Sequence, residues 1–371
     1  MNDRRPSSAS RRLADARAFF DPQRLAIGRR LRGLRKNQLA ALVGTTPTAV
    51  GQYEAGTHRP SERTLSQLAL ALGVPVEFFT VGHGARAVDS AHAHFRSLRS
   101  TSQIERDQAL SHGHLAAGIV ALLEHYVELP DVSIPEYPVW PEEIAGEGPI
   151  KAARLARQLL NVPRGPIRHV VRLLEQHGVV ALHLPPVSRR LDAFSVSAHP
   201  RPLVLLNPAK GDYYRNRFDG GHELGHLIMH ADAEPGSRIV EDQAHRFAAE
   251  FLMPEEEIAE QLPAMAQWDR LAALKAQWGV SMAALLYRGR TLGIMRDVTY
   301  RNAMSTMSSR GWRQQEPGVR PPLEQPTLLT KAVELLTEAG IGRDALAEQA
   351  HVSRGDFDLL VPERPYPPPA L

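Results

Sequence analysis

The sequence contains no cysteine, and this absence excludes several kinds of site at once. Without thiols there is no disulfide scaffold, no thiolate-bound zinc and no cysteine nucleophile. A metal ion in this chain must therefore be held by histidine and carboxylate side chains. No run of about 18 apolar residues occurs, and the first 35 residues lack the apolar stretch of a secretory signal. We therefore expect an intracellular, cytoplasmic protein with no membrane-spanning helix.

Positive charge is nearly balanced overall but concentrated at the amino terminus. The 371 residues carry a net charge of +3, whereas residues 1–35 contain ten Arg against three Asp. A basic end of this kind is the electrostatic footprint expected of a protein that binds nucleic-acid phosphates. A solvated arm is the alternative for residues 1–20, and we expect a disordered basic arm there.

The rest of the chain divides into three parts. At about 100–200 residues per domain, the length predicts two or three domains. Residues 21–80 show the close helical spacing of a small domain, and residues 81–93 have the composition of a linker. A small helical segment is expected over residues 327–361. Residues 90–320 are mostly helical in pattern, with short strand-like runs at 179–184, 192–197 and 203–206. The expected fold class is therefore mainly α with a small β-sheet (α+β).

The spacing of a helix-turn-helix surrounds Gly44. A tight turn between two helices favours glycine, which accepts a positive φ angle without strain. Ala40 is small enough for the next helix to pack closely, while Val50 and Tyr53 lie on one face of that helix and can fill the gap. Pro47 fits the first turn of a helix, where its missing N–H costs nothing. These offsets predict a helix-turn-helix in the basic part of the chain.

The helix after this turn would lie in the major groove of DNA. Its outward side chains are expected to be those of Thr46, Thr48, Ala49 and Gln52. Gln can pair with adenine through two hydrogen bonds, and Thr suits thymine or phosphate. Contacts to phosphate add affinity without reading sequence, and we expect them from Arg35, Lys36 and Arg59. A helical bundle used only for dimerisation or partner docking is the alternative.

The segment from Leu25 to Phe79 resembles the XRE, or lambda-repressor-like, family of DNA-binding domains. The similarity rests on Gln52-Tyr53-Glu54-Ala55-Gly56, on Pro60 and on Leu72-Gly73-Val74. Arg35 and Lys36 are a departure, because the family usually has Thr and Gln at these positions. The resemblance implies a helical bundle that binds double-stranded DNA, with a homodimer as one possible assembly.

The most specific chemical pattern is His222-Glu223-Leu224-Gly225-His226. On a helix, positions i and i+4 lie one above the other, so both imidazoles can point at the same metal ion. Two neutral imidazoles make half of a tetrahedral zinc site. Glu223 lies one residue round the helix, where it can accept a proton from water without being a ligand. The spacing predicts His222 and His226 as metal ligands and Glu223 as the catalytic base; two buried structural histidines are the alternative.

A catalytic zinc site also needs a third protein ligand, for which the sequence offers three candidates. His230 continues the same face, but a helix rises about 12 Å from His222 to His230, which is too far for one ion to bridge easily. Glu241 and His245 lie on the next helix, which is expected to begin near Ile239. An oxyanion stabiliser is required as well, and nearby candidates are Tyr213, Tyr214, Arg217, His230 and His245.

A longer series of motifs resembles the ImmA/IrrE family of metallopeptidases. Besides the two helices, it includes Asp192-Ala193-Phe194-Ser195, Leu206-Asn207-Pro208, Leu252-Met253-Pro254, Trp278-Gly279-Val280-Ser281 and Gly311-Trp312-Arg313. The similarity covers roughly residues 90–320 and implies a zincin-like metallopeptidase domain. It also implies that Glu241, the carboxylate that opens the second motif, is the third metal ligand. His245 stands where the family usually has Asn.

Together these features predict a DNA-binding transcriptional regulator with a zinc-dependent endopeptidase domain. The resemblance implies limited cleavage of a repressor or an antitoxin-like protein. Mn²⁺ or another divalent ion can bind the same nitrogen and oxygen ligands as Zn²⁺. The alternative is a transcription regulator whose metallopeptidase-like domain senses a metal, a ligand or a partner and hydrolyses nothing. A third hypothesis makes the chain the antitoxin-like partner of another protein.

Overall fold

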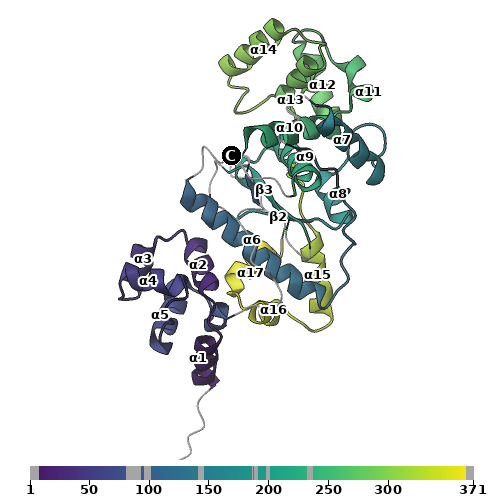
Figure 1. Ribbon diagram of the computed structural model, residues 1–371. Helices are drawn as coiled ribbons and strands as arrows, with labels where there is room; N and C mark the ends of the chain where they lie inside the picture. Colours follow the sequence, from purple (N-terminus) through teal and green to yellow (C-terminus); the bar gives the residue numbers. More distant parts are fainter. Residues whose placement is uncertain are drawn as a thin grey trace, which may run out of the picture.

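The computed structural model describes residues 8–80, 93–95, 102–140, 146–185, 187, 191–197, 201–231 and 237–364. Figure 1 shows helices α1–α5 at one end, a small sheet in the middle and helices α11–α14 at the far end. The architecture is mainly helical with one small sheet, as predicted. None of the helices in the described ranges is long and apolar enough to cross a bilayer. The linker expected over residues 81–93 lies outside these ranges apart from its last residue.

The amino-terminal domain is a bundle of short helices. Asp21 and Thr46 accept hydrogen bonds from backbone N–H groups two and three residues further on, which is why α2 and α4 begin there. Gly44 has a φ angle of 65°, as the turn between α3 and α4 requires. The elements are α1 (Ser8–Ala18), α2 (Pro22–Leu31), α3 (Lys36–Leu42), α4 (Pro47–Glu54), α5 (Glu62–Leu72) and the 3₁₀ turn η1 (Val76–Phe79).

A disordered arm was expected over residues 1–20, but residues 8–18 form helix α1, and residues 1–7 lie outside the described ranges. The ring of Phe20, just after the helix, packs 6.5 Å from that of Phe79. Arg59 Nη1 donates a hydrogen bond of 3.0 Å to the Ala18 carbonyl at the end of α1. These contacts join segments far apart in the chain, so the local excess of arginine does not reveal them.

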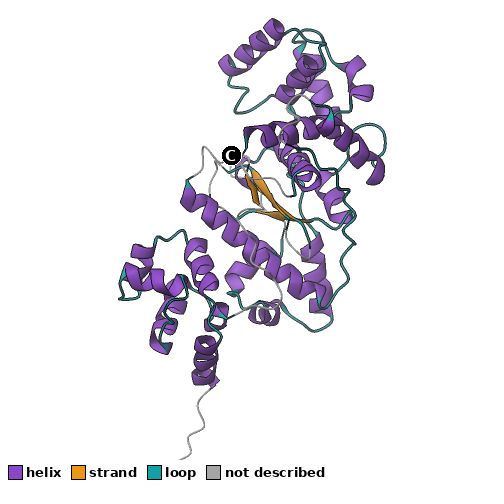
Figure 2. Cartoon of the chain, in the orientation of Figure 1, coloured by secondary structure: helices purple, strands orange, loops and turns teal. Residues whose placement is uncertain are grey.

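A four-stranded sheet occupies the middle of the molecule (Figure 2). Its strands are β1 (Ala93–Phe95), β2 (Val180–His183), β3 (Ala193–Val196) and β4 (Leu203–Leu206), in the order β1-β3-β4-β2. β3 pairs antiparallel with β1 and β4, whereas β2 pairs parallel with β4. Every residue of β2, β3 and β4 is buried, because the sheet is covered on both faces. This burial explains the continuous apolar runs in the sequence.

The two faces of the sheet contribute to different hydrophobic cores. Phe194 and Leu205 belong to a core shared with α6 (Gln103–Glu124) and the amino-terminal domain. Ala193, Val204 and Leu206 belong to a second core, separate from the first. Side chains alternate between the faces of a strand, so Ser195 lies on the same face as Ala193. This is the face against which α9 packs.

Helices α9 (Tyr213–Met229) and α10 (Arg238–Leu252) are the centre of the second core. They pack against each other and against α7 (Gly148–Leu159), and α8 (Val170–Gln176) also contacts α9. α10 begins one residue before the position expected from the sequence and ends at Leu252, before Met253-Pro254. Beyond it follow α11 (Glu255–Ile258), α12 (Trp268–Trp278), α13 (Met282–Thr291) and α14 (Asp297–Ser309).

The small helical segment expected over residues 327–361 consists of three helices, α15 (Leu328–Glu338), α16 (Arg343–Gln349) and α17 (Arg354–Leu360). The Arg32 guanidinium donates hydrogen bonds of 2.6 and 2.7 Å to the buried carboxylate of Asp356 on α17. Apolar side chains of these three helices share one core with α6 and the amino-terminal domain. The carboxy-terminal segment therefore attaches the amino-terminal domain to the rest of the molecule.

Candidate metal centre and nucleic-acid interface

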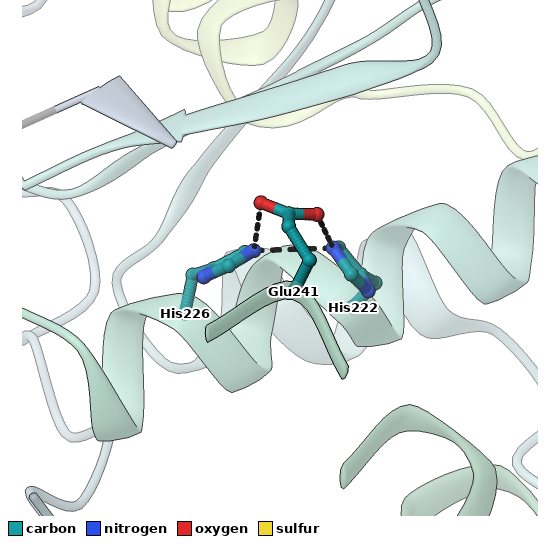
Figure 3. A group of neighbouring side chains, drawn as sticks. All are labelled: His222, His226 and Glu241. Atoms are coloured by element: carbon teal, nitrogen blue, oxygen red, sulfur yellow. Dashed lines mark hydrogen bonds and ion pairs between the residues drawn. The ribbon is translucent and has the colours of Figure 1, made fainter. Parts of the chain in front are cut away.

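Helices α9 and α10 bring His222, His226 and Glu241 together, and we call these three the His-His-Glu group (Figure 3). His222 Nε2 and His226 Nε2 are 3.1 Å apart. The Glu241 carboxylate bridges both rings, with Oε2 3.2 Å from His222 Nε2 and Oε1 3.5 Å from His226 Nε2. One ligand atom from each residue lies within 4.8 Å of the other two, so three potential donors surround one point.

Small residues on α9 allow this close approach of the two helices. A Cβ atom added at Gly225 would lie only 2.9 Å from Cδ1 of the buried Phe247 ring on α10. A Cβ atom at Gly221 would make ordinary contacts of 3.5 Å with Leu252. Gly220 and Gly221 both lie inside α9, where each costs about 1 kcal/mol against Ala. The glycines weaken the helix, but Gly225 lets α10 approach α9.

Of the three candidates for a third ligand, the structure brings Glu241 beside both imidazoles. Burial raises the pKa of the Glu241 carboxyl, but the interactions with His222 and His226 outweigh burial and hold the pKa well below its usual value. His230 lies next to His226 instead of joining the group. The His245 ring packs 4.8 Å from Phe218 and 5.2 Å from Tyr287, measured between ring centroids.

The carboxylate of Glu223 is held by a residue to which the sequence motifs assign no chemical role. Ser195 Oγ donates a hydrogen bond of 2.7 Å to Glu223 Oε2, and both residues are fully buried. Ser195 comes from β3, so the sheet orients the side chain next to the two histidines. Its signal in the sequence is slight: it is the one polar residue in the strand Ala193–Val196.

A second missed residue, Gln243 on α10, lies behind His226. His226 Nδ1 is 3.1 Å from His230 Nδ1, and His230 Nε2 is 2.9 Å from Gln243 Oε1. Gln243 Nε2 in turn donates a hydrogen bond of 3.0 Å to the Trp140 carbonyl. Nothing in the sequence pattern distinguishes Gln243 from other polar residues of a helix, because its partners, His230 and the Trp140 carbonyl, come from two other segments.

Two candidates for the oxyanion stabiliser have other partners. Tyr214 donates a hydrogen bond of 2.9 Å from its hydroxyl to the Val319 carbonyl. The buried Arg217 donates to the carbonyls of Gly279 and Ile167 and forms an ion pair with the buried Glu324. Arg217 therefore connects α9 to distant loops.

A cavity of about 320 Å³ opens one helical turn from the His-His-Glu group. Asp219 precedes His222 by three positions on α9, and His245 follows Glu241 by four on α10. Both line the cavity. Four of the other lining residues are aromatic, Phe218, Tyr287, Tyr300 and Trp312, and the rest include polar and charged side chains. The cavity offers room for a large side chain beside the candidate site.

The expected DNA-contacting residues form an exposed face around α4. The exposed ones are Arg35, Lys36, Thr46, Thr48, Gln52 and Arg59, and Ala49 is half-buried. Val50 and Ala40 are buried between the helices, as the helix-turn-helix spacing predicts.

Several of the exposed residues around α4 also make contacts within the domain. Thr46 Oγ1 accepts a hydrogen bond from the Ala49 N–H. Lys36 Nζ lies 3.5 Å from the Glu54 carboxylate. The side chain of Gln38 accepts a hydrogen bond from the Arg35 N–H, so α3 keeps a capped start although the usual Thr is absent.

Two segments of the chain match models of known families. Residues 25–79 match a helix-turn-helix model, and residues 174–289 match the model of the IrrE N-terminal-like domain. A search of curated proteins finds no significant match. Residues 25–79 are thus an XRE-type helix-turn-helix domain, and in the same chain residues 174–289 belong to a peptidase-family domain of the IrrE/ImmA type.

Proposed function

We propose that this regulator is a zinc-dependent endopeptidase whose helix-turn-helix domain binds double-stranded DNA. The observation that carries the proposal is the convergence of His222, His226 and Glu241 on one point, with Glu223 in the next position of the same helix. Two structural histidines would not require a carboxylate from another helix. The exposed residues around α4 support DNA binding by the other domain.

The donor set fits a catalytic zinc ion. Two imidazole nitrogens and one carboxylate oxygen are a ligand set found in zinc peptidases, which keep a further position for water or substrate. A glutamate carboxylate is anionic at neutral pH, as metal ligation requires. Mn²⁺ can use the same donors, because nitrogen and oxygen ligands bind several divalent ions.

The residues around the site can perform amide hydrolysis. When bound, zinc acts as a Lewis acid that polarises the scissile carbonyl and makes water more acidic. Glu223 takes a proton from the attacking water and delivers it to the amide nitrogen as the C–N bond breaks. Ser195 holds Glu223 Oε2 through its 2.7 Å hydrogen bond, which orients the carboxylate for both transfers. The product is one new carboxylate and one new amine.

The substrate we propose is a repressor or an antitoxin-like protein. The cavity beside the His-His-Glu group would accept one side chain of the substrate, and its aromatic walls favour a large one. Cleavage of a regulator would take place in the cytoplasm, where the helix-turn-helix domain meets DNA. Binding as a homodimer would let two copies read a two-fold symmetric operator.

Glu223→Gln tests the proposal. This change removes the base but keeps the size of the side chain, so Zn²⁺ and DNA binding should be unchanged while proteolysis falls by at least about 100-fold. Cleavage is measured by mass spectrometry after incubation with the proteins encoded beside this gene. Undiminished regulation in cells carrying Glu223→Gln would favour the alternative, a domain that senses a metal or partner without hydrolysis.

A further inference from the structure

A chain of buried polar groups begins at the nitrogen of His226 that faces away from the His-His-Glu group. It runs from His226 Nδ1 to His230 Nδ1 at 3.1 Å, and from His230 Nε2 to Gln243 Oε1 at 2.9 Å. It ends where Gln243 Nε2 donates to the Trp140 carbonyl at 3.0 Å. None of the three side chains is more than 1% exposed, so bulk water does not compete for these hydrogen bonds.

The carbonyl of Trp140 determines the direction of every hydrogen bond in this series of polar groups, because a carbonyl can only accept. It requires the amide nitrogen of Gln243 on its side, which leaves Gln243 Oε1 as an acceptor facing His230. His230 Nε2 must then carry a proton, and in a neutral imidazole Nδ1 is consequently the acceptor. His226 Nδ1 must therefore carry the proton, and His226 Nε2 presents its lone pair to the His-His-Glu group.

We infer that His230 and Gln243 are positioning residues that hold His226 in the tautomer able to bind a metal ion. The inference rests on the proposed function, since it assigns a role only if the His-His-Glu group holds a metal. A His226 ring with its proton on Nε2 has no lone pair to offer there. Hydrogen bonds that fix the tautomer of a ligand in this way are worth about 10- to 100-fold in metal affinity.

Zinc affinity tests the inference without relying on catalysis. Gln243→Leu removes the acceptor that orients His230, so the Zn²⁺ dissociation constant should rise about 10- to 100-fold. His230→Leu should have a similar effect. His230→Asn places a side-chain oxygen near the position of Nδ1 and should recover most of the affinity. His112→Leu replaces another buried histidine, on α6, and serves as the control with unchanged affinity.

A second readout reports the tautomer itself. Long-range ¹H–¹⁵N spectra of the metal-free protein should show the proton of His226 on Nδ1 in the wild type and a mixture of tautomers in Gln243→Leu. A role limited to packing would leave this signature unchanged. Affinity is measured by competition with a chromophoric chelator, and circular dichroism establishes that each variant is folded.

The outcomes separate this inference from the proposed function. A folded Gln243→Leu variant that binds Zn²⁺ as tightly as the wild type overturns the inference and leaves the metal site standing. If Gln243→Leu does not fold, the pair His230→Leu and His230→Asn decides, and equal affinities overturn the inference. A wild-type protein that binds no Zn²⁺ overturns the proposed function, and the inference with it.

Discussion

Gly225→Ala adds one methyl group where α9 and α10 approach each other. The new Cβ would lie 2.9, 3.0 and 3.2 Å from Cδ1, Cγ and Cβ of Phe247, distances that require something to move. Phe247 is fully buried, and its ring stacks on that of Phe251 at 5.6 Å, so it has little room to turn away. We therefore expect α10 to be displaced from α9.

Two opposing effects set the size of the change in the free energy of unfolding. Overpacking a core costs about 1–3 kcal/mol, whereas replacing a helical Gly by Ala contributes about 1 kcal/mol of stability. Gly118→Ala is the matched control, because Gly118 lies in α6 and a Cβ there meets nothing within 4 Å. The control should gain about 1 kcal/mol, and Gly225→Ala should be about 1–3 kcal/mol less stable than the control.

Thermal unfolding measures the loss of stability, and a Zn²⁺ titration measures the effect on metal binding. Glu241 is on α10 together with Phe247, so moving this helix also moves the carboxylate away from the histidines. Gly225→Ala should therefore bind Zn²⁺ more weakly than the wild type, and Gly118→Ala should not. If both variants gain the same stability and bind Zn²⁺ equally well, the reasoning about helix packing is wrong.

Three further predictions address the ligand, the DNA contacts and the response to pH. Glu241→Ala should lose bound zinc in elemental analysis, and retained stoichiometry would assign the third ligand elsewhere. Gln52→Ala should lower affinity for the operator by about 1–3 kcal/mol in a mobility-shift assay. Lys36→Ala should reduce the salt dependence of DNA affinity by about one released ion. DNA affinity that is unchanged by both substitutions would contradict the assigned DNA-binding face. Burial lowers the pKa of His112 to about 4 from 6.5, so the unfolded chain takes up a proton first and stability falls as pH drops from about 6.5 to about 4. His112→Gln should lose less stability over this range in denaturant titrations, by an amount on the order of 3 kcal/mol, and an unchanged pH dependence would show that His112 does not titrate this way.

Features encoded by local spacing could be predicted from the sequence. A helix repeats every 3.6 residues, so His222 and His226 had to share a face. Gly44 marked the turn between two closely packed helices, because glycine accepts a positive φ angle. The strands β2–β4 were visible as apolar runs because burial on both faces leaves no polar alternation. These signals lie within a few residues of one another.

Other parts of the site depend on contacts between distant segments. Ser195 reaches Glu223 from β3, and Gln243 reaches His230 from the next helix, although neither residue stands out in its own segment. The helix over residues 8–18 likewise packs against η1 and accepts a hydrogen bond from Arg59 at its end. Sequence reasoning missed all three because hydrogen bonds and packing between elements leave no periodic pattern.

The sequence by itself determined the pair of imidazoles, the glutamate beside them and the helix-turn-helix, because each follows from the geometry of one or two neighbouring helices. Spacing along the chain left Glu241, His230 and His245 open, and only the resemblance implied Glu241; in the tertiary structure it is Glu241 that lies against both rings. The physical reason is the packing of α10 on α9 at Gly225. Which residue of a second helix faces the first depends on the angle and register of that packing, and spacing along the chain does not specify either.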